Sequence, residues 1–213
     1  YIVREHNGRV QVLVQKRSGS VDIAKGKWDQ SLATQMIARD GGDYETALRR
    51  GLKEELGLEP DNYAAAQVGG SSWLRVYKKY AGQEAYNREF VSLFLVKVKS
   101  EAQPRVHSDK VSEVRWMDWD EYVETIRRDP AQFTKTAGYY VLDPAVLDGT
   151  DQAIKAFLRD ETPPPFPIRR SCYFSLNGEY DVLISMYDSN KEVRLLIYDR
   201  VLRKTHKIGR VVA

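Results

Sequence analysis

The chain has 213 residues, enough for one substantial domain and a small appendage. A hydrophobic content of 42% and an aromatic content of 11% are typical of a globular protein and exclude a fibrous or compositionally biased chain. The 33 basic and 30 acidic residues largely cancel to a net charge of +3. This charge is compatible with a nucleotide or RNA ligand but does not by itself argue for one.

The cysteine count and the hydropathy of the chain predict the cellular compartment of the protein and whether it contacts a membrane. Cys172 is the only cysteine, which excludes an internal disulfide and predicts an intracellular, reducing compartment such as the cytoplasm or the mitochondrial matrix. No apolar run approaches the length needed to span a bilayer, so we expect no membrane partner. Tyr1 already falls inside a predicted strand, so we expect residues to precede it in the full-length protein, with room for a removed targeting segment.

The first part of the chain predicts a β-hairpin followed by a basic loop. The hairpin consists of a strand, a turn and a second strand, at residues 1–4, 7–8 and 10–16. The loop behind it runs through residue 27 and has basic residues at its two ends, Arg17 and Lys27. Both are candidate ligands for substrate phosphates, although scattered surface bases are the more common interpretation of such residues.

Residues 44–56 predict a helix with two chemically distinct sides. Asp43 is a candidate N-cap, and Gly57 stands where a helix usually ends. An apolar stripe and a charged set leave the helix on different sides: Ala47, Leu48 and Leu52, and Arg50, Glu54 and Glu55. Two adjacent carboxylates with an arginine one turn earlier favour a site for a hard divalent cation and an anionic substrate.

The middle of the chain predicts further strands and two helices. The expected strands are residues 62–68, 72–80, 89–98 and 113–117, with a polar loop at 81–88. The strand at 89–98 has the strongest signal, so we expect it to be central and largely buried. The expected helices are residues 119–128, capped by Asp118 and ended by Pro130, and residues 150–159.

Aromatic and basic residues are mixed in the expected strand at 72–80. They are Trp73, Tyr77 and Tyr80 with Arg75, Lys78 and Lys79. This mixture is compatible with stacking on RNA bases, and Arg75 is our candidate for a substrate contact in this strand. The alternative, that the aromatic side chains belong to the core of the protein, is the more common use of such residues in a half-buried strand.

A proline-rich stretch predicts a domain boundary. Four prolines fall between residues 163 and 167, so we expect a stiff connector at 161–168 between a domain at 1–160 and a small β appendage at 169–213. Within the appendage we expect three antiparallel strands, at residues 172–176, 180–187 and 193–198. Because so short a segment buries little core, we expect it to contact the first domain or a protein partner.

The helix at 44–56 resembles the signature helix of the Nudix hydrolases. The family pattern is Gly, five residues, Glu, seven residues, then Arg-Glu-apolar-any-Glu-Glu-any-Gly-apolar. The run from Arg50 to Leu58 agrees at eight of nine places when the two wildcards are counted. The resemblance covers roughly residues 1–145, with elements in family order. It implies an α/β/α Nudix sandwich with a mixed sheet, in the α/β class, followed by the small antiparallel β appendage.

This chain lacks three elements on which the chemistry of the family depends. Gly51 stands where the family has a metal-binding glutamate, and Gly42 stands at the earlier glutamate position. The run around Trp28 also resembles the branch related to isopentenyl-diphosphate isomerases, whose members carry a glycine-histidine pair just after it. This chain has Thr34-Gln35 there instead.

The resemblance implies the roles of the remaining site residues. Glu54 and Glu55 would hold Mg²⁺ or Mn²⁺, and Arg50 would orient them through a salt bridge. Glu89 begins a strand where relatives often supply a further carboxylate, so it is a third candidate ligand, with a surface charge as the alternative. We therefore take Glu54, Glu55 and Arg50 as candidate catalytic residues.

Two functions follow from this incomplete site. The lapsed elements favour a non-catalytic or weakly active Nudix domain used as a binding or assembly module, with a nucleotide, diphosphate or RNA ligand, or a protein partner at the β appendage. The remaining glutamates favour a metal-dependent pyrophosphohydrolase acting on a nucleoside diphosphate derivative, an RNA 5′ end or another organic diphosphate. We also expect Gly51→Glu to stabilise the helix by on the order of 0.5–1 kcal/mol and to restore a third carboxylate.

Overall fold

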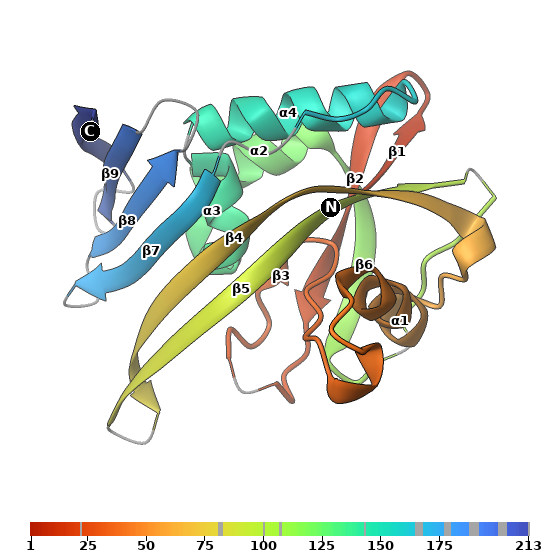
Figure 1. The fold of residues 1–213 in the computed structure, drawn as a ribbon, viewed down its shortest axis with the longest axis horizontal. Coiled ribbons are helices and arrows are strands. Elements are labelled where there is room, and N and C mark those ends of the chain that lie inside the picture. Colours follow the sequence, from red (N-terminus) through yellow and green to blue (C-terminus); the bar gives the residue numbers. More distant parts are fainter. Residues whose placement is uncertain are drawn as a thin grey trace. The chain divides into compact units, whose positions relative to one another are not determined.

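The computed structural model describes residues 1–21, 23–80, 83–99, 101–106, 108–142, 144–164, 168–176, 180–187, 192–199 and 204–212, with side chains described mainly within residues 1–69 and 90–164. The chain forms two compact units (Figure 1). The first comprises residues Tyr1–Ala66, Phe94–Val141 and Ile154–Pro163, and the second Gln67–Leu93, Leu142–Ala153 and Pro164–Ala213. The predicted division at residues 160 and 168 stays a prediction.

A mixed sheet is the centre of the first unit. Its strands are β1 (Ile2–His6), β2 (Arg9–Arg17), β3 (Trp28–Asp29), β6 (Val111–Asp118) and the end of β5 (Gln83–Val98). β2 pairs antiparallel with β1, β3 and β6, whereas β1 pairs parallel with β5. The turn between β1 and β2 has positive φ at Asn7 (51°) and Gly8 (71°), as a tight hairpin turn requires.

Helices cover the two faces of this sheet. Helix α1 (Tyr44–Leu56) and helix α2 (Trp119–Arg128) lie on opposite sides of β2 and β6 in Figure 1. Successive side chains of a strand point to opposite faces, and Val12, Leu13 and Val14 are all buried, so both faces of β2 are covered. Leu13 belongs to the cluster that contains Leu52 of α1.

Helix α1 has the predicted bounds and caps. The Asp43 carboxylate accepts hydrogen bonds from the backbone N–H groups of Glu45 (3.3 Å) and Thr46 (2.8 Å). At the other end Gly57 has φ 65°, and its N–H donates to the Lys53 carbonyl oxygen at 3.0 Å. Both ends of the helix are therefore set by local sequence, as the N-cap and C-cap preferences predict.

The second unit contains a strand order of β5–β4–β7–β8–β9–β10. β4 (Tyr63–Tyr80) pairs parallel with β7 (Ile168–Leu176), and the remaining pairs from β7 through β8 (Tyr180–Tyr187), β9 (Glu192–Asp199) and β10 (Lys204–Val212) are antiparallel. The sequence predicted three of these last strands and missed β10. Lys204–Val212 alternates poorly between apolar and polar residues, but its backbone completes a ladder on β9.

Three expectations about the middle of the chain are corrected. β4 is one strand where two were expected, and β5 begins at Gln83, inside the expected loop. β5 is not uniformly buried, since Phe90 is 77% exposed while Leu95 is fully buried. Backbone pairing along a long hairpin does not need an apolar side chain at every position, so polarity predicted a loop where the ladder continues.

The helices after β6 also differ from expectation. α2 has the predicted bounds, but the Asp118 side chain makes no cap hydrogen bond and accepts from Gln11 and Arg9 of β2 instead. Helix α3 (Lys135–Leu142) was not expected, and helix α4 (Pro144–Leu158) begins six residues before the expected helix. Pro144 is the first residue of α4, where proline fits because its missing N–H would be unpaired there anyway. No described helix is both long and apolar enough to cross a membrane.

Candidate functional site

Gly51 lies on the buried side of α1, and the space that a side chain at this position would take is filled by a residue from outside the helix. A Cβ placed on Gly51 would lie 2.9 Å from both Cβ and Cγ2 of Thr34 and 3.2 Å from its Oγ1. Thr34 belongs to the loop that precedes the helix, and its Cβ carries the side-chain branch next to the backbone, so it cannot swing away. The space that in the family holds a metal-binding glutamate is therefore occupied here by Thr34. The expectation that Gly51→Glu stabilises the helix is corrected, because the added side chain would collide with Thr34.

Arg50 ties this loop to the helix. Its Nε and Nη2 atoms donate to the two Asp40 carboxylate oxygens at 2.9 and 3.0 Å, and Nη2 also donates to the Gln35 carbonyl oxygen at 2.6 Å. The Asp40 side chain is 1% exposed, so this bidentate pair is nearly dry. Asp40 was not among the predicted site residues. The sequence does carry a sign of its role. Asp40 is a carboxylate residue two positions before Gly42, and Gly42 is the position at which the family pattern has its earlier glutamate.

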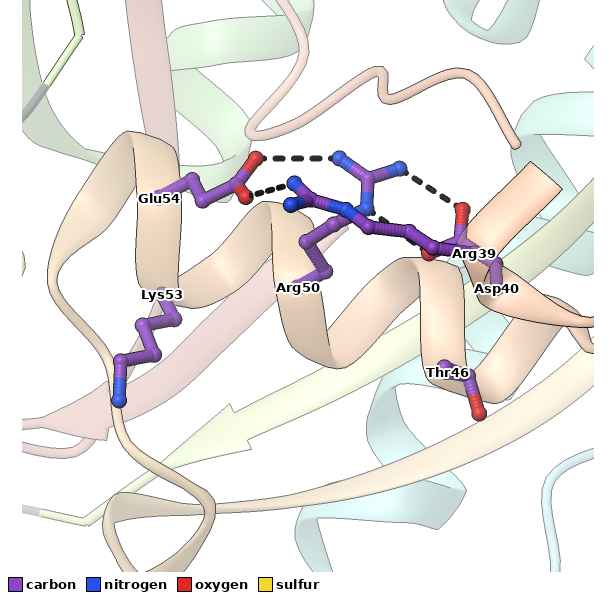
Figure 2. A pocket seen from close by; sticks show the side chains of 6 residues that line it. All are labelled: Arg39, Asp40, Thr46, Arg50, Lys53 and Glu54. Carbon is purple, nitrogen blue, oxygen red and sulfur yellow. Dashed lines mark hydrogen bonds and ion pairs between the residues drawn. The ribbon is translucent and has the colours of Figure 1, made fainter. Parts of the chain in front are cut away.

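Glu54 is held between two arginines. Its Oε1 accepts from Arg39 at 2.5 Å and its Oε2 accepts from Arg50 at 3.1 Å. Figure 2 shows both guanidinium groups facing the Glu54 carboxylate, in an open depression of about 570 Å³. The predicted ion pair between Arg50 and the helix glutamates is thus formed with Glu54. Lys53, which also lines the depression, extends away from Glu54 in Figure 2 and pairs with Glu59 at 2.9 Å.

Glu55 lies in a different environment from its neighbour. Partial burial raises the pKa of its carboxyl above the ordinary value, and the positive charges of Lys110, Arg50 and Arg17 act in the opposite direction. Arg17, a predicted phosphate ligand, is therefore within electrostatic range of Glu55. Lys110, which was not among the predicted site residues, is also within electrostatic range of Glu55.

The other predicted ligands are less closely defined. Lys27 joins the loop after β2 through its backbone, where its carbonyl oxygen accepts from the Arg17 N–H at 2.9 Å. Glu89 lies on β5 and Arg75 on β4, opposite Tyr173 of β7, but the side chains of both residues lie outside the described part of the structure. Their predicted roles as metal ligand and substrate contact stay predictions.

The described residues do not fit a Mg²⁺ or Mn²⁺ site. A hard cation prefers several carboxylate oxygens that converge without competing cations. Both oxygens of Glu54 are engaged by guanidinium groups, and Gly51 supplies no ligand. Within the described residues there is no group of three or more histidine, cysteine, aspartate and glutamate side chains placed to hold a metal ion.

The Arg50–Asp40 pair predicts a loss of stability in acid. Hydrogen bonding by the Arg50 guanidinium, assisted by the Ile37 N–H, lowers the pKa of Asp40 from 3.8 to about 2. A carboxyl whose pKa is lower in the folded state stabilises the fold above its unfolded value, and that contribution is lost as the pH falls through its folded value. We therefore expect the Asp40 contribution to be complete above about pH 4 and to disappear by about pH 2.

The measurement is the free energy of unfolding of the parent and of Asp40→Asn from pH 7 to pH 2. The variant should be less stable at pH 7, and the difference between the two proteins should shrink as the pH approaches 2. A difference that stays constant over this range would show that Asp40 acts by shape and not by charge.

Comparison with known proteins places this site in a family. The NUDIX domain model matches residues 1–137, so the chain belongs to the Nudix family. Similar solved structures include a NUDIX hydrolase from Alicyclobacillus acidocaldarius, at 12% identity and a TM-score of 0.53, covering 77% of this chain and 96% of that one. The Caenorhabditis elegans Ap4A hydrolase is similar at 15% identity and a TM-score of 0.44, covering 74% of this chain and 92% of that one. A Deinococcus radiodurans protein, DR0079, is similar at 20% identity and a TM-score of 0.45, covering 66% of this chain and 77% of that one.

The family model confirms the predicted family, and together with the Alicyclobacillus structure it confirms the mixed α/β fold class. The Alicyclobacillus structure supports the fold alone, because its identity to this chain is low. Members of the family generally use Mg²⁺ or Mn²⁺. In the hydrolysis of a diphosphate such an ion binds the attacking water and the phosphate oxygens.

Proposed function

We propose that this chain is a Nudix-fold domain that serves as a binding or assembly module, with diphosphate hydrolysis lost or weak. The observation that supports this proposal is the contact between Gly51 and Thr34. A glycine that merely lacked the carboxylate would leave a space that one substitution could refill. Here Thr34 would lie 2.9 Å from a Cβ added at position 51, so the loop already fills this space and a single substitution would collide with it.

The chemistry of the family explains why this contact matters. Residues at i, i+3 and i+4 share one side of a helix, so a glutamate at position 51 would converge with Glu54 and Glu55 on one metal cluster. That cluster neutralises phosphate charge and lowers the pKa of the attacking water. Of these three positions, 51 carries no carboxylate and Glu54 is bound to two guanidinium groups, which leaves Glu55 as the carboxylate that pairs with neither Arg39 nor Arg50.

The alternative is a metal-dependent pyrophosphohydrolase acting on a nucleoside diphosphate derivative, an RNA 5′ end or another organic diphosphate. The position of Glu55 favours it. Arg17 and Lys110 are the groups near Glu55 that would bind phosphate oxygens, and the raised pKa of Glu55 suits a group that moves a proton. Glu89 would have to supply the further metal ligand that α1 lacks.

Phosphate release decides between the two functions. The parent protein is incubated with a panel of nucleoside diphosphate derivatives, 5′-triphosphorylated RNA and prenyl diphosphate, with Mg²⁺ or Mn²⁺. We expect no release, or only slow release, above that in the same mixtures without protein, because the metal cluster is incomplete.

Two variants provide the control for this assay. Rapid turnover by the parent that disappears in Glu55→Gln and persists in Glu45→Gln would overturn the proposal in favour of the hydrolase. Glu45 is a matched control because it is an exposed glutamate of the same helix that pairs with Arg49, away from the depression.

The proposed binding role can be tested for a small ligand or RNA and, separately, for a protein partner. A nucleotide, diphosphate or RNA ligand would meet Arg17 and Lys110, so fluorescence anisotropy with labelled ADP and a labelled RNA should detect binding that weakens in Arg17→Ala.

For a protein partner we propose the edge of strand β10 that does not face β9 as the binding surface. In the described strand order β10 pairs only with β9, and a free edge accepts a further strand through its backbone groups. Light scattering tests whether the strand comes from a second copy.

A further inference from the structure

The ion pairs around Glu54 form an alternating network that carries no net charge. Two guanidinium groups, of Arg39 and Arg50, meet two carboxylates, of Asp40 and Glu54 (Figure 2). Arg50 contacts both carboxylates and Arg39 contacts Glu54. Each carboxylate already has a cationic partner from this chain, so the network is complete without a bound ion.

The loop delivers Arg39 in a fixed position. Ala38–Asp40 form a 3-10 turn in which the Asp40 side chain accepts from the Ile37 N–H at 2.8 Å, and Gly41 ends the turn with φ 65°. Asp40 is in turn anchored by Arg50 on α1. Arg39 is therefore the residue that precedes a buried anchor, which limits how far its backbone can move from Glu54.

The strength of the two links differs. The Arg39 and Glu54 side chains are 65% and 49% exposed, and an isolated ion pair of this kind contributes little to stability. Arg50 and Asp40 are 16% and 1% exposed. The buried link holds the loop, and the exposed link places a positive charge on the carboxylate. A divalent cation approaching Glu54 would have to displace Arg39 and would meet the charge of Arg50 as well.

We propose that Arg39 acts as a built-in cation for Glu54 and keeps Mg²⁺ and Mn²⁺ off the carboxylate side of α1. This inference rests on the proposed function, since it explains how a Nudix helix retains Glu54 without using it as a metal ligand. It assigns a role to a residue outside the family pattern, on the loop before the helix.

The test is the affinity for Mn²⁺ alone, measured from the electron paramagnetic resonance signal of the free ion at low ionic strength. Removing one positive charge within a few ångströms of a divalent cation is expected to tighten binding by about three- to tenfold. Arg39→Gln should show this gain over the parent. Arg39→Lys keeps the charge and should stay close to the parent. In the double variant Arg39→Gln with Glu54→Gln the gain should be lost.

Arg49→Gln is the matched control. Arg49 is an exposed arginine of α1 that pairs with Glu45 at 2.5 Å, as Arg39 pairs with Glu54, but it does not contact Glu54. Equal Mn²⁺ affinity in the parent and Arg39→Gln would overturn the inference, and so would an equal gain in Arg49→Gln. The assay contains no substrate, so its outcome is independent of the phosphate-release result that tests the proposed function.

Discussion

Replacing Gly51 with alanine should destabilise the protein by on the order of 1 kcal/mol, although alanine is the better helix residue by about that amount. The new Cβ would lie 2.9 Å from two carbons of Thr34, and forcing extra atoms into a filled site costs about 1–3 kcal/mol. Gly51→Glu should cost more, about 2 kcal/mol or above, because it adds a longer chain and a third negative charge beside Glu54 and Glu55.

A double-mutant cycle measures the contact directly. Thr34→Gly removes the colliding atoms, so Thr34→Gly with Gly51→Ala should be more stable than the sum of the two single changes by about 0.5–3 kcal/mol. Thr34→Ala keeps the Cβ that lies 2.9 Å away and should recover only part of this coupling. Chemical denaturation of the four proteins gives the coupling energy, and a value of zero would show that the loop moves freely away from the helix.

Leu52→Ala should have the largest effect on stability, a loss of about 2–5 kcal/mol. Leu52 is fully buried on the sheet side of α1, in one cluster with Ile2, Leu13 and Val96. Truncation removes apolar contact and leaves a cavity between helix and sheet. Because Leu52 follows Gly51 directly, the same change should also loosen the ion pairs that Arg50 and Glu54 make with the loop.

Lys53→Ala is the control for this prediction. The Lys53 side chain is 64% exposed and lies next to Leu52 in the sequence, so its truncation should change the free energy of unfolding by no more than about 0.5 kcal/mol. A loss below about 1 kcal/mol for Leu52→Ala, measured by urea unfolding, would contradict the packing of α1 on the sheet.

The loop from Thr34 to Asp40 accounts for the character of the site. Four of its residues contact α1: Thr34 at Gly51, Gln35 and Asp40 at Arg50, and Arg39 at Glu54. The helix that would serve a Nudix enzyme as a metal-binding element is used here as a docking surface for this segment. In the proposed binding module, the Glu54 carboxylate would hold the loop of the chain itself in place of a metal ion.

Local sequence determined the elements whose causes are local. The cap at Asp43, the helix end at Gly57 and the turn at Asn7 depend on neighbours within a few residues, so their positions could be predicted. The family resemblance came from the same helix, and it also showed that a carboxylate is missing at Gly51.

Only the tertiary structure decided what replaces that carboxylate. Thr34 is seventeen positions before Gly51 and Asp40 ten before Arg50, and no periodic pattern links such pairs. The Arg50–Glu54 pair is local to the helix, but whether Glu54 also pairs with Arg39 depends on where the loop folds back, which is set by the packing of the whole unit. The extent of β5 and the existence of β10 were decided in the same way, because ladder hydrogen bonds come from a partner strand and not from the strand's own residues.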